Sequence, residues 1–254
     1  MTVSTPRLKS AGIGAASLAL FLGVWKAGSL FMGSSIILPS PEETLREALR
    51  LTAGKAFWLS LGATLLRGTA GFALSFAAGL LLGYPAGRSP LFRRFLQPYL
   101  TVIHSTPVLA IILIALVWFR TEVVPVFVAF LMAFPVIIGN VVQGIGAVDE
   151  GLVAMARVYR VGRRKRILGL YLPSVLPFIA SGASAALGLS WRVVVAAEVL
   201  SQPVLGIGTG LQEAKIRLET PRVFAWTAAA LLVSRLTEGA FSRLMRRLRN
   251  RRGA

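Results

Sequence analysis

Long apolar runs separated by short basic segments constrain this chain more than any other feature. A membrane-crossing helix needs about 20 mostly apolar residues, and six stretches fit that requirement: residues 11–31, 62–84, 97–118, 123–142, 174–200 and 223–241. Only 15% of the residues are charged and the mean hydropathy is +0.71, whereas soluble domains carry about 25% charged residues. The sequence therefore predicts an all-α integral membrane protein with about six transmembrane helices.

The positive charges predict how these helices are oriented. A net charge of +18 would suggest nucleic acid in a soluble protein, but here the basic residues lie between apolar runs, so we predict no nucleic-acid partner. Cytoplasmic segments retain Lys and Arg, and most of the 28 Lys and Arg residues fall in the two ends and in the loops 85–96 and 143–172. We predict a multi-pass membrane protein with cytoplasmic termini. It has a tail at 1–10, one transmembrane domain at 11–242 and a basic tail at 243–254.

The first apolar run has a second interpretation. A basic start, an apolar stretch and the small residues Ala27-Gly28-Ser29 resemble a cleaved signal peptide. The run is long for a signal sequence, and its removal would leave an odd number of spans with the N-terminus outside. We favour its retention as the first span.

The chain lacks the residues that several classes of enzyme need. The chain has no cysteine and a single histidine, His104, which excludes thiolate chemistry and any multi-histidine metal site. It has no P-loop sequence, so it has no ATP-hydrolysing P-loop site of its own. The glycines of Gly206-Ile-Gly208-Thr-Gly210 lack the strand–turn–helix context of a dinucleotide site, and we predict a flexible or re-entrant turn on the outer side. No catalytic, cofactor-binding or metal-binding residues are predicted.

Besides Lys26, the charged residues and the histidine within the predicted spans are Arg67, His104, Arg192, Glu198, Arg235 and Glu238. Charged groups are costly in hydrocarbon, so these side chains should face protein or water. The spacing favours structural ion pairs of Glu198 with Arg192 and of Glu238 with Arg235, with contact to a transported solute as the alternative. His104 lies close to a proline, and we predict that it bonds backbone groups freed there rather than relaying protons.

The 143–172 loop combines two apolar helical patterns with a dense basic turn. Residues 152–159 give the first pattern and Ile167 begins the second, while six of the ten residues from Arg157 to Arg166 are basic. We predict two short helices folded back at the membrane surface, with Leu172-Pro173 ending the segment. Such a turn can bind anionic lipid or the acidic cleft of a soluble partner, and charge alone leaves both open.

This loop resembles the EAA loop of ABC importer permeases. The similarity is carried by Ala154-Met155-Ala156-Arg157, Leu172-Pro173, Pro177 and Gly182. Further motifs are similar to those of the nitrate/sulfonate/taurine branch of this family: Leu38–Pro41, Thr64–Arg67, Gly71-Phe72, Ala197-Glu198 and Gly206–Gly208. The resemblance covers about residues 38–240.

The resemblance implies a permease subunit of the bacterial plasma (inner) membrane that works as a homodimer in lipid and has no ATPase site of its own. ATP and Mg²⁺ would bind to separate P-loop ABC ATPase subunits, and an extracytoplasmic binding protein would deliver a small solute such as a sulfonate, nitrate or vitamin precursor. The coupling positions would be Ala154, Ala156, Arg157, Arg160, Val161 and Gly162, joined by Arg163, Arg164, Leu172 and Pro173. Two positions depart from the family pattern, because its loop glutamate falls on Ala154 and its turn glycine on Arg160.

Two other classes of function fit parts of the sequence. An autonomous secondary transporter or channel is the first, but intramembrane acids for ion coupling are scarce and the chain is short for a two-repeat carrier. A purely structural membrane scaffold is the second, and it leaves the loop pattern unexplained. The sequence identifies no particular solute.

Overall fold

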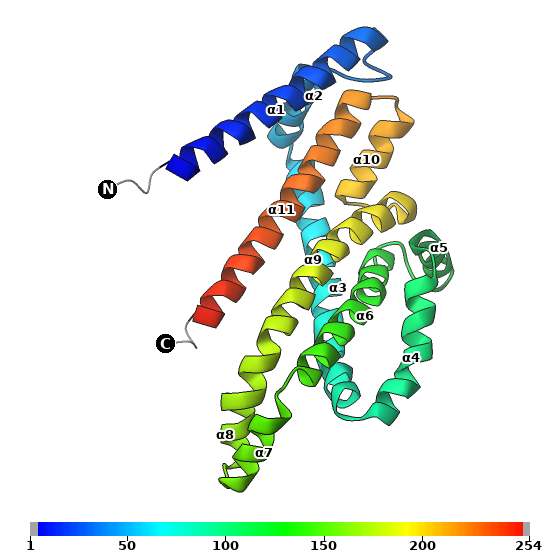
Figure 1. The fold of residues 1–254 in the computed structure, drawn as a ribbon. Helices are drawn as coiled ribbons and strands as arrows, with labels where there is room; N and C mark the ends of the chain where they lie inside the picture. The colour runs from blue at the N-terminus through cyan, green and yellow to red at the C-terminus, as the bar shows by residue number, and fades with distance from the viewer. Residues whose placement is uncertain (1–4, 251–254) are drawn as a thin grey trace.

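The computed structural model of the chain describes residues 5–250, with side chains described for residues 12–245. All regular elements in this part are helices (Figure 1). They are α1 (Thr5–Met32), α2 (Pro41–Ala53), α3 (Lys55–Arg88), α4 (Pro90–Ser105), α5 (Val108–Trp118), α6 (Val124–Gly146), α7 (Glu150–Val158), α8 (Arg163–Arg166), the π-helix η1 (Ile167–Tyr171), α9 (Leu172–Ser201), α10 (Ile207–Ile216) and α11 (Thr220–Asn250).

Helices α3, α6 and α9 form the centre of the molecule (Figure 1). Small residues at every fourth position of α3, where side chains share one face, meet α6: Gly71, Ser75, Gly79, Gly83 and Gly87. A Cβ atom on Gly79 would lie 2.5 Å from Ile137, and one on Gly83 would lie 2.9 Å from Val141. The small residues thus let the two backbones approach closely, and this glycine pair serves a contact within the chain.

The small residues of α9 serve two different neighbours. A Cβ on Gly182 would lie 2.5 Å from Asn140 of α6, whereas one on Gly188 would lie 2.7 Å from the Glu238 carboxylate of α11. The small residues of α9 therefore allow close contact with both α6 and α11.

Four described helices are long and apolar enough to cross a membrane, or five if one bent pair counts as a span. The four helices cover Gly12–Met32, Lys55–Arg88, Val124–Gly146 and Arg163–Ser201. They correspond to four of the predicted spans. Helix α11 covers the predicted span 223–241 but is not among them, and it contains Arg235 and Glu238. The membrane class is confirmed, while the count of six stays a prediction.

The predicted span 97–118 is not one straight helix. Helices α4 and α5 replace it and meet at an angle of 100° around Thr106 and Pro107. Proline has no N–H to continue the ladder, and the hydroxyl groups of Ser105 and Thr106 both donate to Val102 O, at 3.3 and 2.7 Å. The average hydropathy of a stretch depends only on its composition, so it cannot detect such a break.

Helix α2 forms from the signals at its start. Ser40 caps it, its Oγ accepting from Glu43 N at 3.3 Å while the Glu43 carboxylate accepts from Ser40 N at 2.8 Å. This reciprocal pair satisfies two N–H groups that the helix cannot reach. Lys26 of α1 lies 2.8 Å from Glu42 Oε2, and this hydrogen bond lowers the pKa of Glu42 below its usual value.

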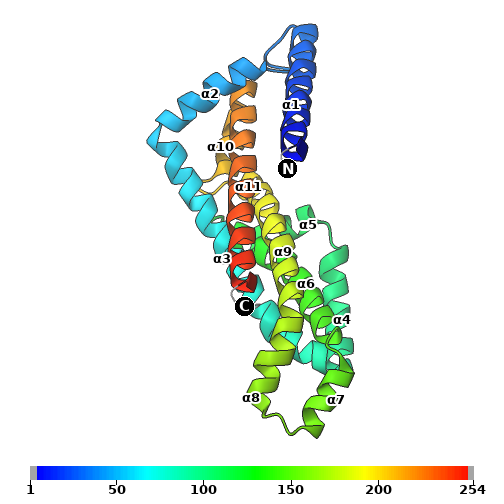
Figure 2. The same cartoon turned by 60° about the vertical axis from the view of Figure 1, so that its left-hand side comes forward.

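The chain ends point towards the same end of the molecule. Figure 2 shows α1 running up to its connection with α2, and α11 running back down towards the end that carries α7 and α8. Helix α1 stands apart from the central helices along most of its length, and its contacts gather at its upper end, where Trp25 donates to Pro39 O and stacks on Phe224.

Candidate functional site

A short helical hairpin, residues 149–166, forms within the loop that the sequence marked at 143–172. Asp149 caps α7, its Oδ1 accepting from the backbone N–H groups of Gly151 at 2.7 Å and Leu152 at 3.2 Å. These N–H groups have no helical carbonyl to reach, so the cap fixes where the helix begins. The acidic start therefore lies at Asp149 and Glu150, and Ala154 occupies the middle of α7.

The hairpin turns through a Schellman motif after α7. Arg160 N–H donates to Arg157 O and Val161 N–H donates to Ala156 O, both at 2.9 Å, which is the hydrogen-bond pattern of that motif. Arg160 has a φ of +50°, a left-handed conformation that favours glycine. The position at which the resemblance places a glycine thus keeps a glycine-like backbone although it carries an arginine.

Replacing Arg160 by Gly is expected to stabilise this turn by about 1 kcal/mol, because glycine has no side chain to strain in the left-handed region. Amide exchange at Val161 should slow by roughly fivefold, measured by hydrogen–deuterium exchange of peptides from residues 156–162. The control Arg157→Gly, inside α7, should speed exchange because glycine weakens a helix interior. Faster exchange in Arg160→Gly would contradict this account of the turn.

Helix α8 continues without a stop into α9, so the predicted end at Leu172-Pro173 is wrong. The connection is the π-helix η1, in which Leu172 N–H donates to Ile167 O, five residues back. Proline interrupts an ordinary α-helix because it lacks an N–H and its ring meets the carbonyl four residues earlier. The wider π turn accommodates Pro173, so one apolar helical segment runs from Arg163 to Ser201.

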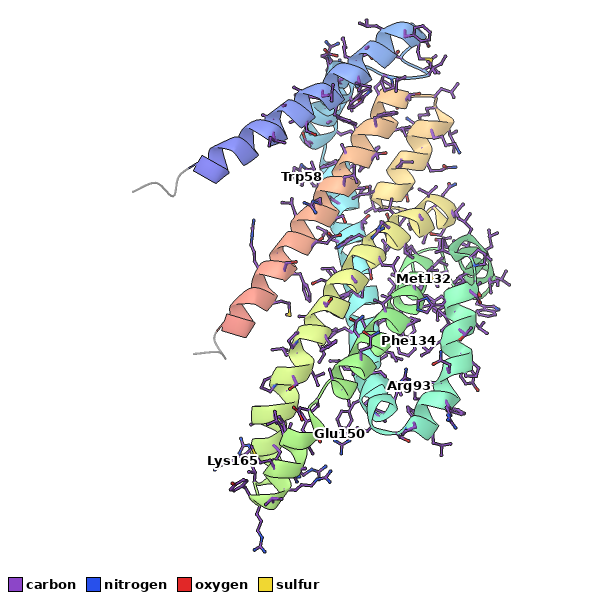
Figure 3. All side chains as sticks on the ribbon, viewed as in Figure 1. Trp58, Arg93, Met132, Phe134, Glu150 and Lys165 are labelled. Atoms are coloured by element: carbon purple, nitrogen blue, oxygen red, sulfur yellow. The ribbon has the colours of Figure 1, made fainter. Side chains whose placement is uncertain are left out.

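The hairpin exposes most of the predicted coupling positions. The exposed ones are Ala154, Arg157, Arg160, Gly162, Arg163, Arg164 and Pro173, and the half-buried ones are Ala156, Val161 and Leu172. Helix α7 has no buried residue, and the large apolar side chains Val158 and Tyr159 are 78% and 76% exposed. Figure 3 shows Lys165 at the far lower end of the molecule and Trp58 in its upper half.

The basic residues of the hairpin fall into two groups. Arg157, Arg163 and Arg166 line a cavity together with Arg88 of α3. Arg160, Arg164 and Lys165 do not line that cavity, and all three are exposed. Three of the six basic residues of the hairpin therefore line this cavity and three lie outside it.

A buried polar network lies at the other end of α9. The side chain of Glu198 is 0% exposed, and its carboxylate accepts from Thr64 Oγ1 at 2.9 Å, Arg67 Nη1 at 2.8 Å and Gly208 N at 3.0 Å. Thr64 Oγ1 in turn accepts from Ile207 N at 2.9 Å. Each donor relieves the cost of burying this carboxylate.

Arg67 extends the network to the loop between α5 and α6. Its Nη2 pairs with Glu122, and its Nη1 donates to Leu205 O at 2.6 Å as well as to Glu198. Glu122 also accepts from Val204 N at 2.9 Å. A single guanidinium therefore ties α3 to α9 and to two loops. The sequence prediction missed Glu122 and the role of Thr64, because both depend on contacts between distant segments.

The two predicted ion pairs are wrong. Glu198 pairs with Arg67, and Arg192 is exposed with its Nε donating to Gly188 O of its own helix at 3.2 Å. Glu238 accepts from Ser234 Oγ at 3.0 Å, and the described side chains show no ion pair between it and Arg235. Proximity along a helix does not determine pairing where another helix brings a better donor into a buried site.

His104 also differs from its prediction. It is exposed at the end of α4, and Ser105 and Thr106 satisfy the carbonyl group near the break in its place. His104 lines a cavity of about 240 Å³ between α4 and α6, together with Arg93, Gln97 and Gln143.

The glycine-rich stretch 206–210 is not a flexible or re-entrant turn. Gly206 precedes α10, and Gly208 and Gly210 lie inside that helix. A Cβ on Gly208 would lie 2.5 Å from Val195 O and 2.6 Å from Glu198 Cβ, and one on Gly210 would lie 2.5 Å from the Trp226 ring. These glycines are needed because α10 packs its backbone directly on its neighbours.

A family model supports the permease interpretation. Residues 75–250 match the binding-protein-dependent transport system inner membrane component, a stretch that includes α6, the hairpin and α9. The chain belongs to this family. It is thus the membrane-embedded, multi-pass permease component of an ABC transport system, and the family implies ATPase and binding-protein components as its partners.

Similar permeases cover nearly the whole chain. A probable ABC transporter permease protein of Brucella melitensis is 29% identical over 94% of this chain and 98% of its own length. A Bacillus subtilis permease protein named for aliphatic sulfonates transport is 30% identical over 90% of this chain and 83% of its own. The taurine transport system permease protein of Escherichia coli is 28% identical over 91% and 86%, respectively.

The fold of the permease also has a solved counterpart. The inward-facing MetNI methionine ABC transporter contains a chain that aligns with a TM-score of 0.57 and 19% identity, over 74% of this permease and 92% of that chain. The all-helical membrane fold predicted from the sequence is therefore confirmed.

Proposed function

We propose that the permease couples solute import to a separate P-loop ATPase through the exposed hairpin. The observation that carries this proposal is the exposed apolar side chains on α7 and its turn: Leu152, Met155, Val158 and Tyr159. Apolar groups clustered beside basic ones mark protein interaction sites, and the surrounding arginines favour an acidic partner. ATP and Mg²⁺ bind on that partner, and this chain contributes the docking contact.

Helix α9 supplies the mechanical connection to the rest of the permease. The helical segment Arg163–Ser201 runs from the hairpin to the buried Glu198 network, and it packs along α6. A displacement of the hairpin by the ATPase therefore moves one end of a continuous helix whose other end is fixed to α3 through Arg67. The π turn at η1 is the point where such helices bend most readily.

The remaining partners follow from the same arrangement. A second copy of the permease completes the solute path and covers apolar surfaces that a single chain exposes, such as Val117 and Trp118 of α5, with membrane lipid around both. An extracytoplasmic binding protein docks at the end that carries α2 and α10. The hairpin and both termini then lie in the cytoplasm of a bacterial cell, next to the plasma (inner) membrane, consistent with the basic loops.

The solute in this proposal is a small anion such as a sulfonate or nitrate. Relatives named for aliphatic sulfonates, taurine and nitrate support this class. Arg192 of α9 and Arg235 of α11 support it too. Both are exposed, and neither forms an ion pair among the described side chains. Intramembrane charges of this kind face water or protein.

The docking proposal predicts the effect of reversing two exposed charges. In the variant Arg164→Glu/Lys165→Glu, co-purification of the ATPase from detergent-solubilised membranes should fall at least about tenfold, because two attractive contacts become repulsive. Solute uptake should fall with it. The matched control is Arg93→Glu/Arg94→Glu, an exposed basic pair at the start of α4, which should retain the ATPase.

Two results would contradict the proposal. Retention of the ATPase by Arg164→Glu/Lys165→Glu, with unchanged solute uptake, would contradict the part of the proposal that gives the exposed basic residues a role in docking. If no ATPase co-purifies with the folded wild-type permease, the permease does not dock an ATPase, and an autonomous carrier is favoured.

A further inference from the structure

We propose that a cavity between the end of α3 and the hairpin binds the phosphate group of an anionic phospholipid. The cavity measures about 330 Å³ and is lined by Arg88, Arg157, Arg163, Arg166, Tyr84 and Tyr171, with Ile167 beside them. The four arginines come from α3, α7 and α8. No local sequence pattern brings them together, since Arg88 lies far from the others along the chain.

The cavity concentrates positive charge without compensation from the protein. No acidic residue lines it, and none of the four arginines forms a salt bridge among the described side chains. Glu150 lines a neighbouring cavity with Arg88 and Arg157 but pairs with neither. Guanidinium groups gathered in one hollow repel one another, so a bound anion stabilises the arrangement.

The geometry of these side chains suits a phosphate group. A guanidinium presents several N–H donors in one plane, which matches two phosphate oxygens at once. The Arg88 guanidinium carbon lies 5.4 Å from the centre of the Tyr171 ring, so the aromatic face holds this cation in place. Its N–H groups remain available at the edge of the plane, and the tyrosine hydroxyl groups can add further hydrogen bonds.

The position of the cavity favours a lipid as the source of that phosphate. Arg88 is the last residue of one candidate span and Arg163 is the first residue of another, which places the cavity at the membrane–water boundary. Phospholipid headgroups lie at this depth, and tyrosines are enriched there. Tyr84 and Ile167 line the cavity and are also exposed, so acyl chains would run along them. Basic pockets at helix ends recognise anionic headgroups in this way.

A bound headgroup would brace the hairpin against the transmembrane helices. Helix α7 has no buried residue, so few contacts of its own hold it against α3. A phosphate bridging Arg88 of α3 with Arg157 and Arg163 would add that connection. The inference does not depend on ATPase docking, because binding of lipid is measured on the permease alone.

The test is ligand binding to the purified full-length permease, measured by native mass spectrometry during separate titrations with phosphatidylglycerol, phosphatidylcholine and inorganic phosphate. Removing two of the four charges in Arg88→Gln/Arg166→Gln should weaken phosphatidylglycerol binding about tenfold and leave phosphatidylcholine binding unchanged. The matched control Arg164→Gln/Lys165→Gln removes the same charge from residues outside the cavity and should bind as the wild type does. A third variant, Arg88→Lys/Arg166→Lys, keeps the charge but loses the planar set of N–H donors. It should lose less affinity for phosphatidylglycerol than the glutamine variant, and it tests the site even if the glutamine variant does not fold.

Three outcomes would overturn the proposal. Equal losses in the cavity variant and the control would show a general attraction to a basic surface. Unchanged binding of phosphatidylglycerol by the cavity variants would show that these arginines do not recognise the lipid. Binding of inorganic phosphate to the wild type, without binding of phosphatidylglycerol, would make a soluble phosphate the source.

Discussion

Replacing Glu198 by Ala is expected to lower the free energy of unfolding of the permease by about 3–5 kcal/mol. The carboxylate is fully buried and bonded to Thr64, Arg67 and the backbone of Gly208, so its removal takes from the buried Arg67 guanidinium one of its two carboxylate partners. The loss should be seen as a shift in the midpoint of SDS-induced unfolding of the purified protein in mixed micelles. Glu198→Gln should lose less, since the amide oxygen can still accept from Thr64.

The control for this effect is Arg192→Ala. Sequence spacing made Arg192 the expected partner of Glu198, but it is exposed and bonds only to its own helix. Its replacement should change the free energy of unfolding by no more than about 0.5 kcal/mol. Equal destabilisation by both substitutions would show that Arg192, rather than Arg67, balances the buried carboxylate.

Replacing Gly208 by Ala should be the second large effect, with a loss of about 1–3 kcal/mol or more in the same unfolding measurement. The new Cβ would lie 2.5 Å from Val195 O, 2.6 Å from Glu198 Cβ and 2.8 Å from Val199 N. Two of these atoms belong to the backbone of α9 and cannot rotate away. Helix α10 would have to move off α9, which also breaks the hydrogen bond from Gly208 N to Glu198.

The control for Gly208 is Gly62→Ala on α3, where no atom lies within 4 Å of the added Cβ. Alanine favours a helix over glycine, so this variant should be neutral or slightly more stable. A neutral Gly208→Ala variant would indicate that α10 does not pack against α9 as closely as described.

Local and compositional features of the permease could be predicted from its sequence. Apolar runs of sufficient length located the helices α1, α3, α6 and α9, because a bilayer accepts little else. The start of α2 is also a local feature, since Ser40 and Glu43, which cap it, lie only three residues apart. The hairpin motif indicated the family, which the match over residues 75–250 confirms.

Features that depend on distant contacts or on backbone geometry were not predictable in the same way. The bend between α4 and α5 and the π turn before Pro173 arise from how each proline is accommodated, and composition does not encode that choice. The glycines at 206–210 suggested a flexible or re-entrant turn, because glycine allows backbone conformations that other residues rarely adopt. In the fold they mark close packing of α10 on α9 and α11.

The membrane class, most of the helices and the basic character of the 143–172 loop follow from the sequence alone, because hydropathy and charge act over short stretches of chain. Which charges pair with one another depends on how the helices pack. Glu198 pairs with Arg67, 131 residues away, and three of the basic residues of the hairpin line a cavity with Arg88 while the other three do not. The reason is physical: a buried charge is stabilised by whichever donors the packed helices bring within hydrogen-bonding distance, and spacing along one helix does not specify them.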